Sequence, residues 1–159
     1  MTIKVGDKLP NAKFRVMSGD GPAWKTTDDI FKGKKVALFA VPGAFTGTCS
    51  KQHLPSVVTN LDALKGKGVD TIAVTAVNDI SVLDAWKKSA NADKVEFLSD
   101  GNGDFAKAID LSVDLSGAGM GVRSKRYSML VDDGVVKQLN VEESGKFDVS
   151  SGDTMLKQV

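Results

Sequence analysis

Cysteine and histidine are almost absent from this chain: its 159 residues include one of each, Cys49 and His53. A single cysteine cannot form a disulfide within the chain, and a lone thiol is typical of proteins in a reducing compartment. One cysteine and one histidine also cannot supply the ligands of a structural zinc site. The sequence therefore excludes a disulfide scaffold and a Cys/His metal cluster, and we expect neither a metal nor a cofactor.

An excess of charge of either sign is also missing. Lys and Arg total 21 against 20 Asp and Glu, so the formal net charge is +1, and the two signs are interspersed along the chain. A chain without a long-range field of one sign has no electrostatic reason to bind nucleic acid or an anionic membrane surface. The composition, 42% hydrophobic and 26% charged, is close to that of an average soluble globular protein.

Long apolar segments and linkers are lacking too. No run approaches the ~20 apolar residues of a membrane-spanning helix. Residues 1–7 have neither the apolar centre of a signal peptide nor the Arg/Ser content of a transit peptide. No repeat and no Pro/Gly/Ser-rich linker divides the chain. We therefore expect one domain over residues 1–159, located in the cytoplasm.

Two apolar runs predict strands that are buried on both faces. One covers residues 36–41, and the other, rich in β-branched residues, covers residues 71–77. Between them, apolar residues recur at helical spacing over residues 54–64. Because Pro55 lies inside this helical pattern, we expect a kink near it and a separate first turn over residues 49–53.

The second half of the chain predicts further elements in a clear order. We expect a helix, a short strand, a short helix, a β-hairpin with a Gly-containing turn and a closing helix, over residues 79–90, 95–98, 105–109, 127–141 and 151–158. An alternation of strands and helices followed by an antiparallel hairpin predicts an α/β fold with a mixed central sheet and helices on both faces. The thioredoxin-like fold fits this description. A small flavodoxin-like fold is the alternative, but the hairpin argues against its all-parallel sheet.

Cys49 lies where a buried strand gives way to a helix, in the segment Pro42-Gly43-Ala44-Phe45-Thr46-Gly47-Thr48-Cys49-Ser50. The unpaired N–H groups and the positive dipole end of a helix N-terminus favour a thiolate. The Thr46 hydroxyl can donate to the sulfur or accept from a bound peroxide. A lone cysteine is more often a small buried hydrophobic residue, but such a cysteine tends to replace Val or Ala within an apolar run. We therefore interpret Cys49 as a nucleophile that reduces peroxides.

The motif P-G-A-F-T-x-x-C at residues 42–49 resembles the active-site signature of the peroxiredoxins, and in particular of the peroxiredoxin-5 (type II) subfamily. Further segments resemble the same subfamily in the same order, namely residues 5–10, 31–35, 49–55, 77–79 and 123–128. The resemblance therefore covers essentially the whole chain. It implies a thioredoxin-like fold and a thiol-dependent peroxidase that acts on hydrogen peroxide and small alkyl hydroperoxides.

The resemblance implies catalytic roles for four residues. Cys49 would be the attacking nucleophile and would pass through a sulfenic acid. Thr46 would hydrogen-bond the peroxide, and Pro42 would shield the sulfur. The arginine that the family carries just before a late strand corresponds to Arg126, which would favour the thiolate and polarise the peroxide. Arg123 is a nearby competitor for this role, or a residue that supports the pocket.

The chain departs from the subfamily at positions that bear on its mechanism. Gly47 stands where the subfamily usually has proline, which should loosen the loop. There is no second cysteine, and the positions where some relatives carry a resolving thiol are Val74 and Ser150. The resemblance therefore implies a one-cysteine enzyme whose sulfenic acid is reduced by an outside thiol. Glutathione, with or without glutaredoxin, is the first choice and thioredoxin the second. A homodimer with the active-site region near its interface is also implied.

Other interpretations of the same residues lead to different functions. A thioredoxin-fold redox sensor or binding module would use Cys49 once, without turnover. His53 lies four residues after Cys49, a helical spacing that could bring the two side chains together and invites a Cys-His hydrolase interpretation. Such sites normally take the base from a distant segment, and no orienting group or oxyanion hole is recognised, so we favour His53 as a packing or pocket-edge residue. Residues 115–121 are rich in glycine but lack the strand and the Lys-Ser/Thr of a phosphate loop. We interpret them as a flexible rim of the peroxide pocket, and Trp24 and Trp86 as core or interface residues.

Overall fold

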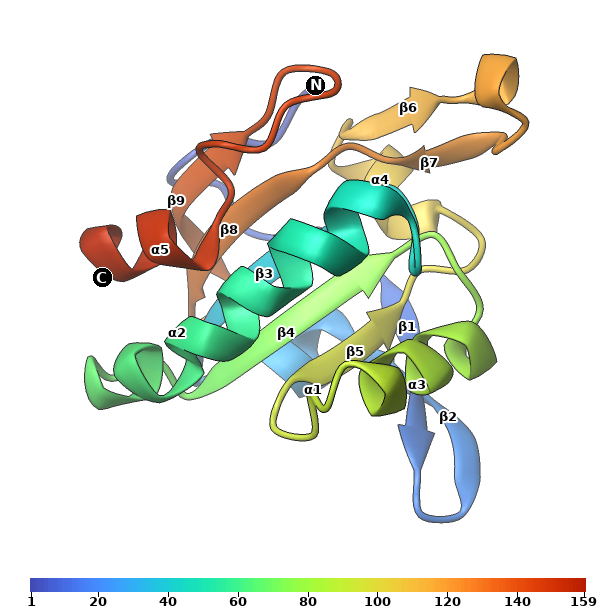
Figure 1. The fold of residues 1–159 in the computed structure, drawn as a ribbon. Coiled ribbons are helices and arrows are strands. Elements are labelled where there is room, and N and C mark those ends of the chain that lie inside the picture. The colour runs from blue at the N-terminus through green and yellow to red at the C-terminus, as the bar shows by residue number, and fades with distance from the viewer.

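A computed structural model describes residues 1–159. Its centre is a seven-stranded sheet in the order β2-β1-β5-β4-β3-β8-β9 (Figure 1). The strands are β1 (Lys13–Ser18), β2 (Gly21–Thr26), β3 (Lys35–Ala40), β4 (Thr71–Ala76), β5 (Glu96–Ser99), β8 (Tyr127–Asp132) and β9 (Val135–Val141). Strands β3, β4 and β5 are parallel, and the other neighbours are antiparallel. This is the mixed sheet predicted for the thioredoxin-like fold.

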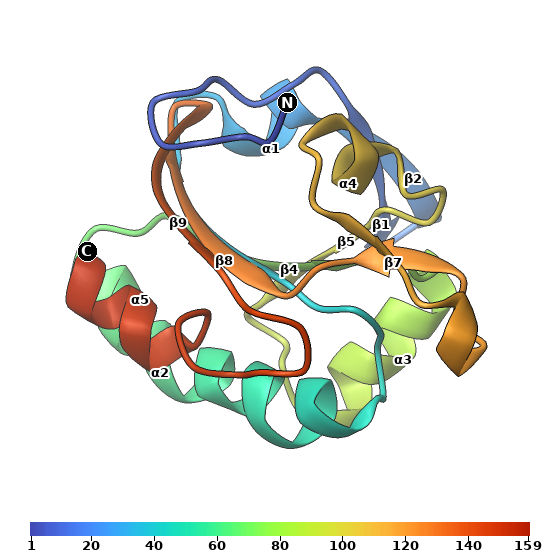
Figure 2. The same ribbon diagram turned by 90° about the horizontal axis from the view of Figure 1, so that it is seen from above.

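Helices cover both faces of the sheet, as Figure 2 shows. On one face lie α2 (Leu54–Gly66), α3 (Ile80–Ser89) and α5 (Gly152–Gln158), and on the other lie α1 (Thr27–Phe31) and α4 (Asp104–Ala108). Alternate residues of β3 belong to two different hydrophobic clusters, with Phe39 in the cluster beneath α2 and Leu38 in the one beneath α1. The unbroken apolar run of β3 in the sequence follows from this burial on both sides.

The helix that carries Cys49 includes a widened, π-helical turn, η1 (Cys49–His53), that continues directly into α2. In this turn the Leu54 N–H donates to the Cys49 carbonyl, five residues earlier. Pro55 accounts for the irregularity, because it has no N–H and its ring would collide with the carbonyl four residues earlier in a regular α-helix. The irregular turn predicted over residues 49–53 is therefore present, but it is continuous with α2 rather than separate.

The remaining predicted elements occur within one or two residues of their expected bounds. Helices α3 and α5 begin after Asp79 and Ser151, whose side chains accept from backbone N–H groups of the first turn. The β8–β9 turn contains Asp133 and Gly134, both with positive φ (50° and 79°), which is the conformation of the favoured two-residue hairpin turn.

Several short elements were not predicted. They are β1, β2 and α1 near the N-terminus, and β6 (Ser112–Asp114), η2 (Ser116–Ala118) and β7 (Val122–Ser124), which form a small two-stranded sheet and its connection. A signal for the first group exists: Phe14 and Val16 alternate with more exposed residues, and Thr26 with Asp29 forms a capping box. Residues 115–121 connect β6 to β7.

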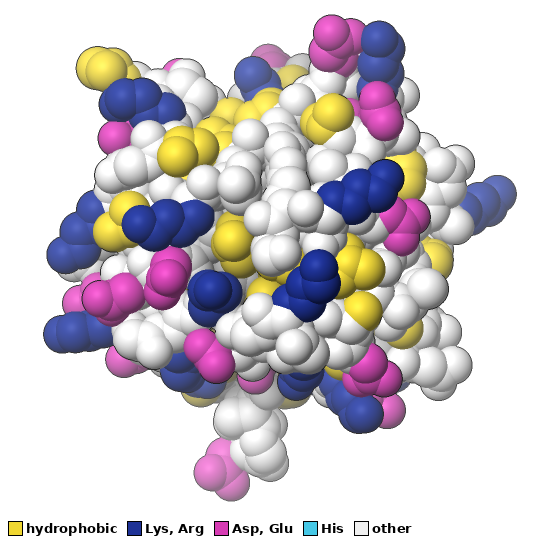
Figure 3. Space-filling model, turned by 90° about the vertical axis from the view of Figure 1, so that its left-hand side faces the viewer, with side chains coloured by type: hydrophobic (Ala, Val, Ile, Leu, Met, Phe, Trp, Pro, Cys, Tyr) yellow, Lys and Arg dark blue, Asp and Glu magenta, His cyan; other side chains and the backbone are white.

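The surface agrees with the balanced composition. On the face seen in Figure 3, basic and acidic side chains are mixed, and neither sign gathers into one area. None of the helices is both long enough and apolar enough to cross a membrane.

Candidate active site

The loop between β3 and the η1 turn encloses Cys49, whose side chain has no exposed surface (0%). The loop is anchored by the Ala44 N–H, which donates to the Asn78 side-chain oxygen at 2.9 Å. At Gly43 there is little room for a side chain: a Cβ there would lie 3.1 Å from a Thr46 methyl group and 3.2 Å from the Met120 side chain. A larger residue at this position of the motif would require these neighbours to shift.

The Thr46 hydroxyl donates its hydrogen to the Gly43 carbonyl at 2.7 Å. A hydroxyl has one hydrogen to donate and two lone pairs to accept with. Of the two roles considered for Thr46 from the sequence, donating to the sulfur and accepting from a peroxide, only the second is open in this arrangement.

Arg126 makes the decisive contact with the cysteine. Its Nη2 atom donates to Cys49 Sγ at 3.0 Å. The sheet explains how two residues so far apart in sequence meet, because Tyr127 at the start of β8 pairs with Ala40 at the end of β3. Arg126 therefore lies just beyond the end of β3, beside the Cys49 loop. The three ion pairs of the structure lie elsewhere, so no carboxylate lies within ion-pair distance of this guanidinium.

Arg123, the competing arginine, contacts backbone carbonyls instead. Its Nε donates to Met120 at 2.9 Å, and its Nη1 donates to Val77 at 3.2 Å and to Pro42 at 3.5 Å. These bonds tie the 115–121 connection to the loop that carries Pro42. Arg126, not Arg123, reaches Cys49.

His53 is fully buried and holds Arg126 in position. Arg126 Nη1 lies 2.9 Å from His53 Nδ1, and His53 Nε2 lies 2.9 Å from the Ser150 carbonyl oxygen. A guanidinium only donates and a carbonyl only accepts, so Nδ1 must be the acceptor and Nε2 must carry the hydrogen. Burial, helped by the positive charge of Arg126, lowers the pKa of His53 to about 3. The imidazole is therefore neutral at physiological pH.

This geometry argues against the Cys-His hydrolase considered from the sequence. A general base needs a nitrogen lone pair directed at the nucleophile. The only lone pair of His53 accepts from Arg126, and the hydrogen-bond donor to Cys49 is Arg126. His53 is instead a buried residue behind the site, close to the packing role that we favoured.

A loop after β9 covers His53 from outside. The Glu142 carboxylate accepts from the Ser150 hydroxyl at 2.7 Å, the Ser150 N–H at 2.9 Å and the Asp148 N–H at 2.6 Å. Burial acts to raise the pKa of Glu142, but the hydrogen bonds from Ser150 and Asp148 outweigh it and lower the pKa. The Phe147 ring packs 5.0 Å from the His53 ring, centre to centre. Glu142 therefore closes the loop that holds Ser150 against His53.

A cavity of about 580 Å³ lies beside Arg126, the residue that contacts Cys49, although Cys49 itself does not line it. Its inner wall includes Pro42 and Arg126, and its other walls are Val113, Leu115, Lys125 and residues 142–146. Of the predicted rim, residues 115–121, only Leu115 lines it. Sequence reasoning missed Lys125 and residues 142–146, because charged residues in an exposed loop have no local pattern that distinguishes them from ordinary surface.

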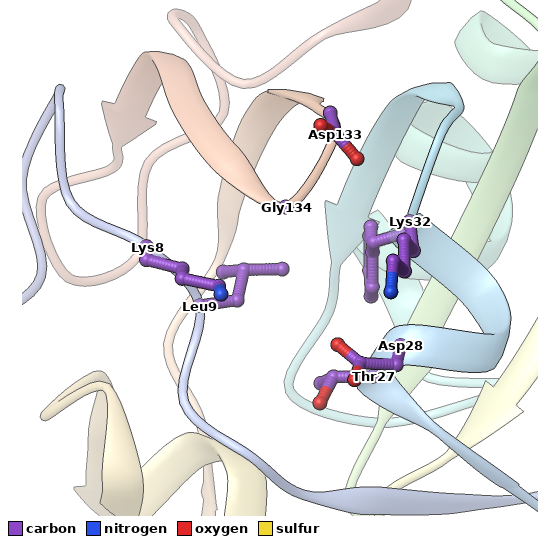
Figure 4. A pocket seen from close by; sticks show the side chains of 8 residues that line it. Lys8, Leu9, Thr27, Asp28, Lys32, Asp133 and Gly134 are labelled. Atoms are coloured by element: carbon purple, nitrogen blue, oxygen red, sulfur yellow. The ribbon is translucent and has the colours of Figure 1, made fainter.

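A second, smaller hollow of about 150 Å³ lies away from Cys49. Its side chains come from the N-terminal segment, α1 and the β8–β9 turn, as Figure 4 shows. Asp133 in this turn accepts from the Gly33 N–H at 2.7 Å, which joins the turn to the end of α1. The hollow contains neither a cysteine nor a histidine, and its contacts are those of a structural junction.

The two tryptophans have different environments. Trp86 is buried, stacks on Phe97 and donates from Nε1 to the Ser50 hydroxyl at 3.0 Å, next to Cys49. Trp24 is 51% exposed on the edge strand β2, with Lys13 and Arg15 over its ring. Of the two positions expected, core or interface, Trp86 takes the core one, whereas Trp24 lies on the surface of the single chain.

Comparisons with known proteins match the chain to one family and to solved structures of the same fold. The Redoxin family matches residues 4–156. The chain is 47% identical over 161 residues to Peroxiredoxin-2E, chloroplastic, of Arabidopsis thaliana, covering 98% of this chain and 69% of that protein. The fold matches reduced Prx3 in complex with hydrogen peroxide from Vibrio vulnificus with a TM-score of 0.96, 46% identity and 99% coverage of each chain. It matches a 1-Cys peroxiredoxin, the antioxidant protein of Plasmodium falciparum, with a TM-score of 0.90, 28% identity and 98% coverage of each chain.

The neutral state of His53 predicts a pH dependence of stability. Between a pH of about 6.5 and about 3 the unfolded chain binds a proton at His53 and the folded chain does not, so the free energy of unfolding falls as the pH is lowered. His53 is the only histidine. A His53→Asn variant should therefore lose less stability on acidification, by up to about 1.4 kcal/mol per pH unit. Urea unfolding of both proteins from about pH 7 to about pH 5 measures this, and parallel curves would contradict it.

Proposed function

The chain belongs to the Redoxin family and, within it, to the peroxiredoxins, and on this premise we propose how its residues carry out the reaction. It is a thiol peroxidase with a single cysteine. The observation that carries the proposal is the 3.0 Å contact between Arg126 Nη2 and Cys49 Sγ. A guanidinium without a carboxylate partner stabilises a thiolate at this distance, and the thiolate is the form that attacks.

In the first step the Cys49 thiolate attacks one oxygen of the peroxide. A sulfur–oxygen bond forms, the oxygen–oxygen bond breaks, and the second oxygen leaves as water or, from an alkyl hydroperoxide, as an alcohol after it takes up a proton. Cys49 is thereby oxidised to a sulfenic acid. Arg126 donates hydrogen bonds to the peroxide oxygens. These bonds strengthen as negative charge builds up on the leaving oxygen, so Arg126 stabilises the transition state more than the bound peroxide and thereby lowers the barrier.

The other residues position and shield the reactants. Thr46, whose hydrogen is committed to Gly43, accepts from the peroxide O–H and orients it. Pro42 separates the sulfur from bulk water. His53 is a positioning residue: it accepts from Arg126 without adding a negative charge, so the full charge of the guanidinium acts on Cys49.

An outside thiol then reduces the sulfenic acid. The absence of a second cysteine supports this step, as do the surroundings of the two positions where a resolving thiol would be expected: Val74 is buried in β4, and Ser150 is buried and bonded to Glu142. We favour glutathione, alone or with glutaredoxin, over thioredoxin. A cytoplasmic location accords with one free thiol, although relatives include chloroplastic forms, and both compartments keep thiols reduced.

A homodimer is the assembly we propose. The Phe45 side chain is 53% exposed beside the Cys49 loop, and its backbone has φ 64°, a strained conformation for a bulky residue that usually needs support from its surroundings. Val122 is also exposed, two residues from Met120, whose side chain meets the same loop at Gly43. An exposed aromatic residue in a strained loop is suited to burial against a second copy of the chain.

The peroxide step is tested by two substitutions. Cys49→Ser should abolish peroxide consumption. Arg126→Lys should lower the rate constant of the parent's reaction with hydrogen peroxide by a factor of roughly 10²–10³, because a single ammonium cannot replace the fork of donors in the transition state. Stopped-flow kinetics of the reduced enzymes measure both effects. Arg15→Lys, on β1, is the matched control and should react like the parent. Equal rates for Arg126→Lys and the control would refute the role of Arg126.

The reductant is tested by steady-state turnover. We expect repeated peroxide reduction with glutathione, faster when glutaredoxin is added, and slower turnover with thioredoxin and its reductase. An enzyme cycles whereas a sensor reacts once, so the same assay separates the peroxidase from the redox-sensor alternative. One equivalent of peroxide consumed per chain with every donor would favour the sensor.

The assembly is tested by sedimentation. Phe45→Glu should shift the protein from dimer to monomer, because it would bury a charge without a partner at the interface. Trp24→Glu is the control, since Trp24 is an equally exposed aromatic residue on the edge strand β2, and should leave the dimer intact. A monomeric parent at micromolar concentration would contradict the proposal.

A further inference from the structure

The cavity beside Arg126 is much larger than hydrogen peroxide needs. Its volume is about 580 Å³, whereas a molecule of water occupies about 30 Å³ in the liquid. It reaches inward as far as Pro42 and Arg126, and Arg126 in turn contacts the sulfur. The cavity therefore has room for a second reactant of the size of a small peptide, beside Arg126, which contacts Cys49.

Most charged groups around this cavity already have partners. Lys146 forms an ion pair with Glu143 at 2.7 Å. Glu142 accepts hydrogen bonds from Ser150 and Asp148. Arg126 donates to His53 and Cys49.

Lys125 is the exception. It lines the cavity beside Arg126, is exposed, and has no carboxylate within ion-pair distance. Its backbone is held in place, because its N–H donates to the Leu111 carbonyl at 2.7 Å. The cavity thus presents one unpaired ammonium on a fixed part of the chain, next to the reacting centre.

We propose that Lys125 binds a carboxylate of the reducing thiol, and that this reductant is a small acidic peptide thiol of the glutathione type. The inference rests on the proposed reduction of Cys49 by an outside thiol. Cys49 has no exposed surface, and residues 142–146 stand over the cavity. Because the sulfur is buried, any thiol needs a local opening of the site to reach it, and a tripeptide already held in the cavity needs a smaller opening than a folded protein does. The apolar side chains of Val113 and Leu115 face the uncharged parts of the tripeptide.

The chemistry at this site balances with two thiol molecules. The thiolate of the first attacks Cys49 Sγ of the sulfenic acid, a sulfur–sulfur bond forms, the sulfur–oxygen bond breaks, and the oxygen leaves as water after protonation. The thiolate of the second attacks the sulfur of the bound peptide in this mixed disulfide. Cys49 leaves as a thiolate, and the two peptide thiols are released as their disulfide. Lys125 orients the first peptide through its carboxylate and takes no part in bond making.

The test compares two thiols on the pre-oxidised enzyme. Glutathione carries carboxylates, and cysteamine carries none. Lys125→Met should lower the rate constant of sulfenic acid reduction by glutathione about three- to tenfold, as expected for the loss of a partly screened ion pair, and should change that for cysteamine less than twofold. The difference between the parent and Lys125→Met in the rate constant for glutathione should become smaller as salt is added. Lys107→Met, an exposed lysine on α4, is the matched control.

Each alternative result has a defined meaning. If glutathione reduces the sulfenic acids of Lys125→Met and Lys107→Met with equal rate constants, the inference is wrong while the proposed reductant stands. If Lys125→Met slows the reduction of the sulfenic acid by glutathione and by cysteamine to the same extent, the lysine acts on the site as a whole and not on a carboxylate. The inference is then wrong as well. If glutathione fails to reduce the parent enzyme but thioredoxin succeeds, the proposed reductant fails and the inference with it. The rate of the peroxide step, measured on the same variants, should not change.

Discussion

A sulfur atom with no exposed surface can work as a thiolate only if a positive charge is buried with it, and the contact between Arg126 and Cys49 supplies that charge. The quality of this contact depends on what holds the guanidinium. A carboxylate behind Arg126 would position it equally well but would cancel much of its field. His53 holds it through a neutral nitrogen instead, and the depth of its burial keeps that nitrogen unprotonated. The neutrality of the histidine is therefore as important to the site as the charge of the arginine.

The sheet makes this contact possible over a separation of 77 residues. Strand β8 runs antiparallel to β3 with Tyr127 opposite Ala40, so the chain enters β8 where the Cys49 loop leaves β3. A shift of one residue in this register would turn the side chains of β8 to the opposite face. Residues of β8 such as Met129, fully buried on one side of the sheet, oppose such a shift. The hydrophobic packing of the strand thus determines the position of Arg126.

Much of this arrangement could be predicted from local patterns, and the part that could not depends on contacts between distant segments. Strand β3 was identified by its apolar run and the β8–β9 hairpin by its turn residues, because each is determined by neighbours in sequence. The motif identified Cys49, but two arginines competed, and only the register of β8 separates Arg126 from Arg123. The hydrogen bond between His53 and Ser150 could not be predicted from the sequence, since an isolated histidine and a serine in a polar loop carry no periodic signal. For Trp24 the sequence left core and interface open, because an exposed tryptophan with cations over its ring carries the same local signal as a buried one.

Ser150 has a consequence for the evolutionary history of this chain. The position corresponds to one where some relatives of the type II subfamily carry a resolving thiol, yet here its hydroxyl donates to Glu142 and its carbonyl accepts from His53. A thiol is a much weaker donor than a hydroxyl, so a return to cysteine would weaken the closure of the loop that supports the histidine and, through it, the arginine. Ser150 is thus part of the support of Cys49. A resolving thiol at this position would require the loop around it to be rebuilt, whereas Val74, the other such position, lies in β4 and outside this loop.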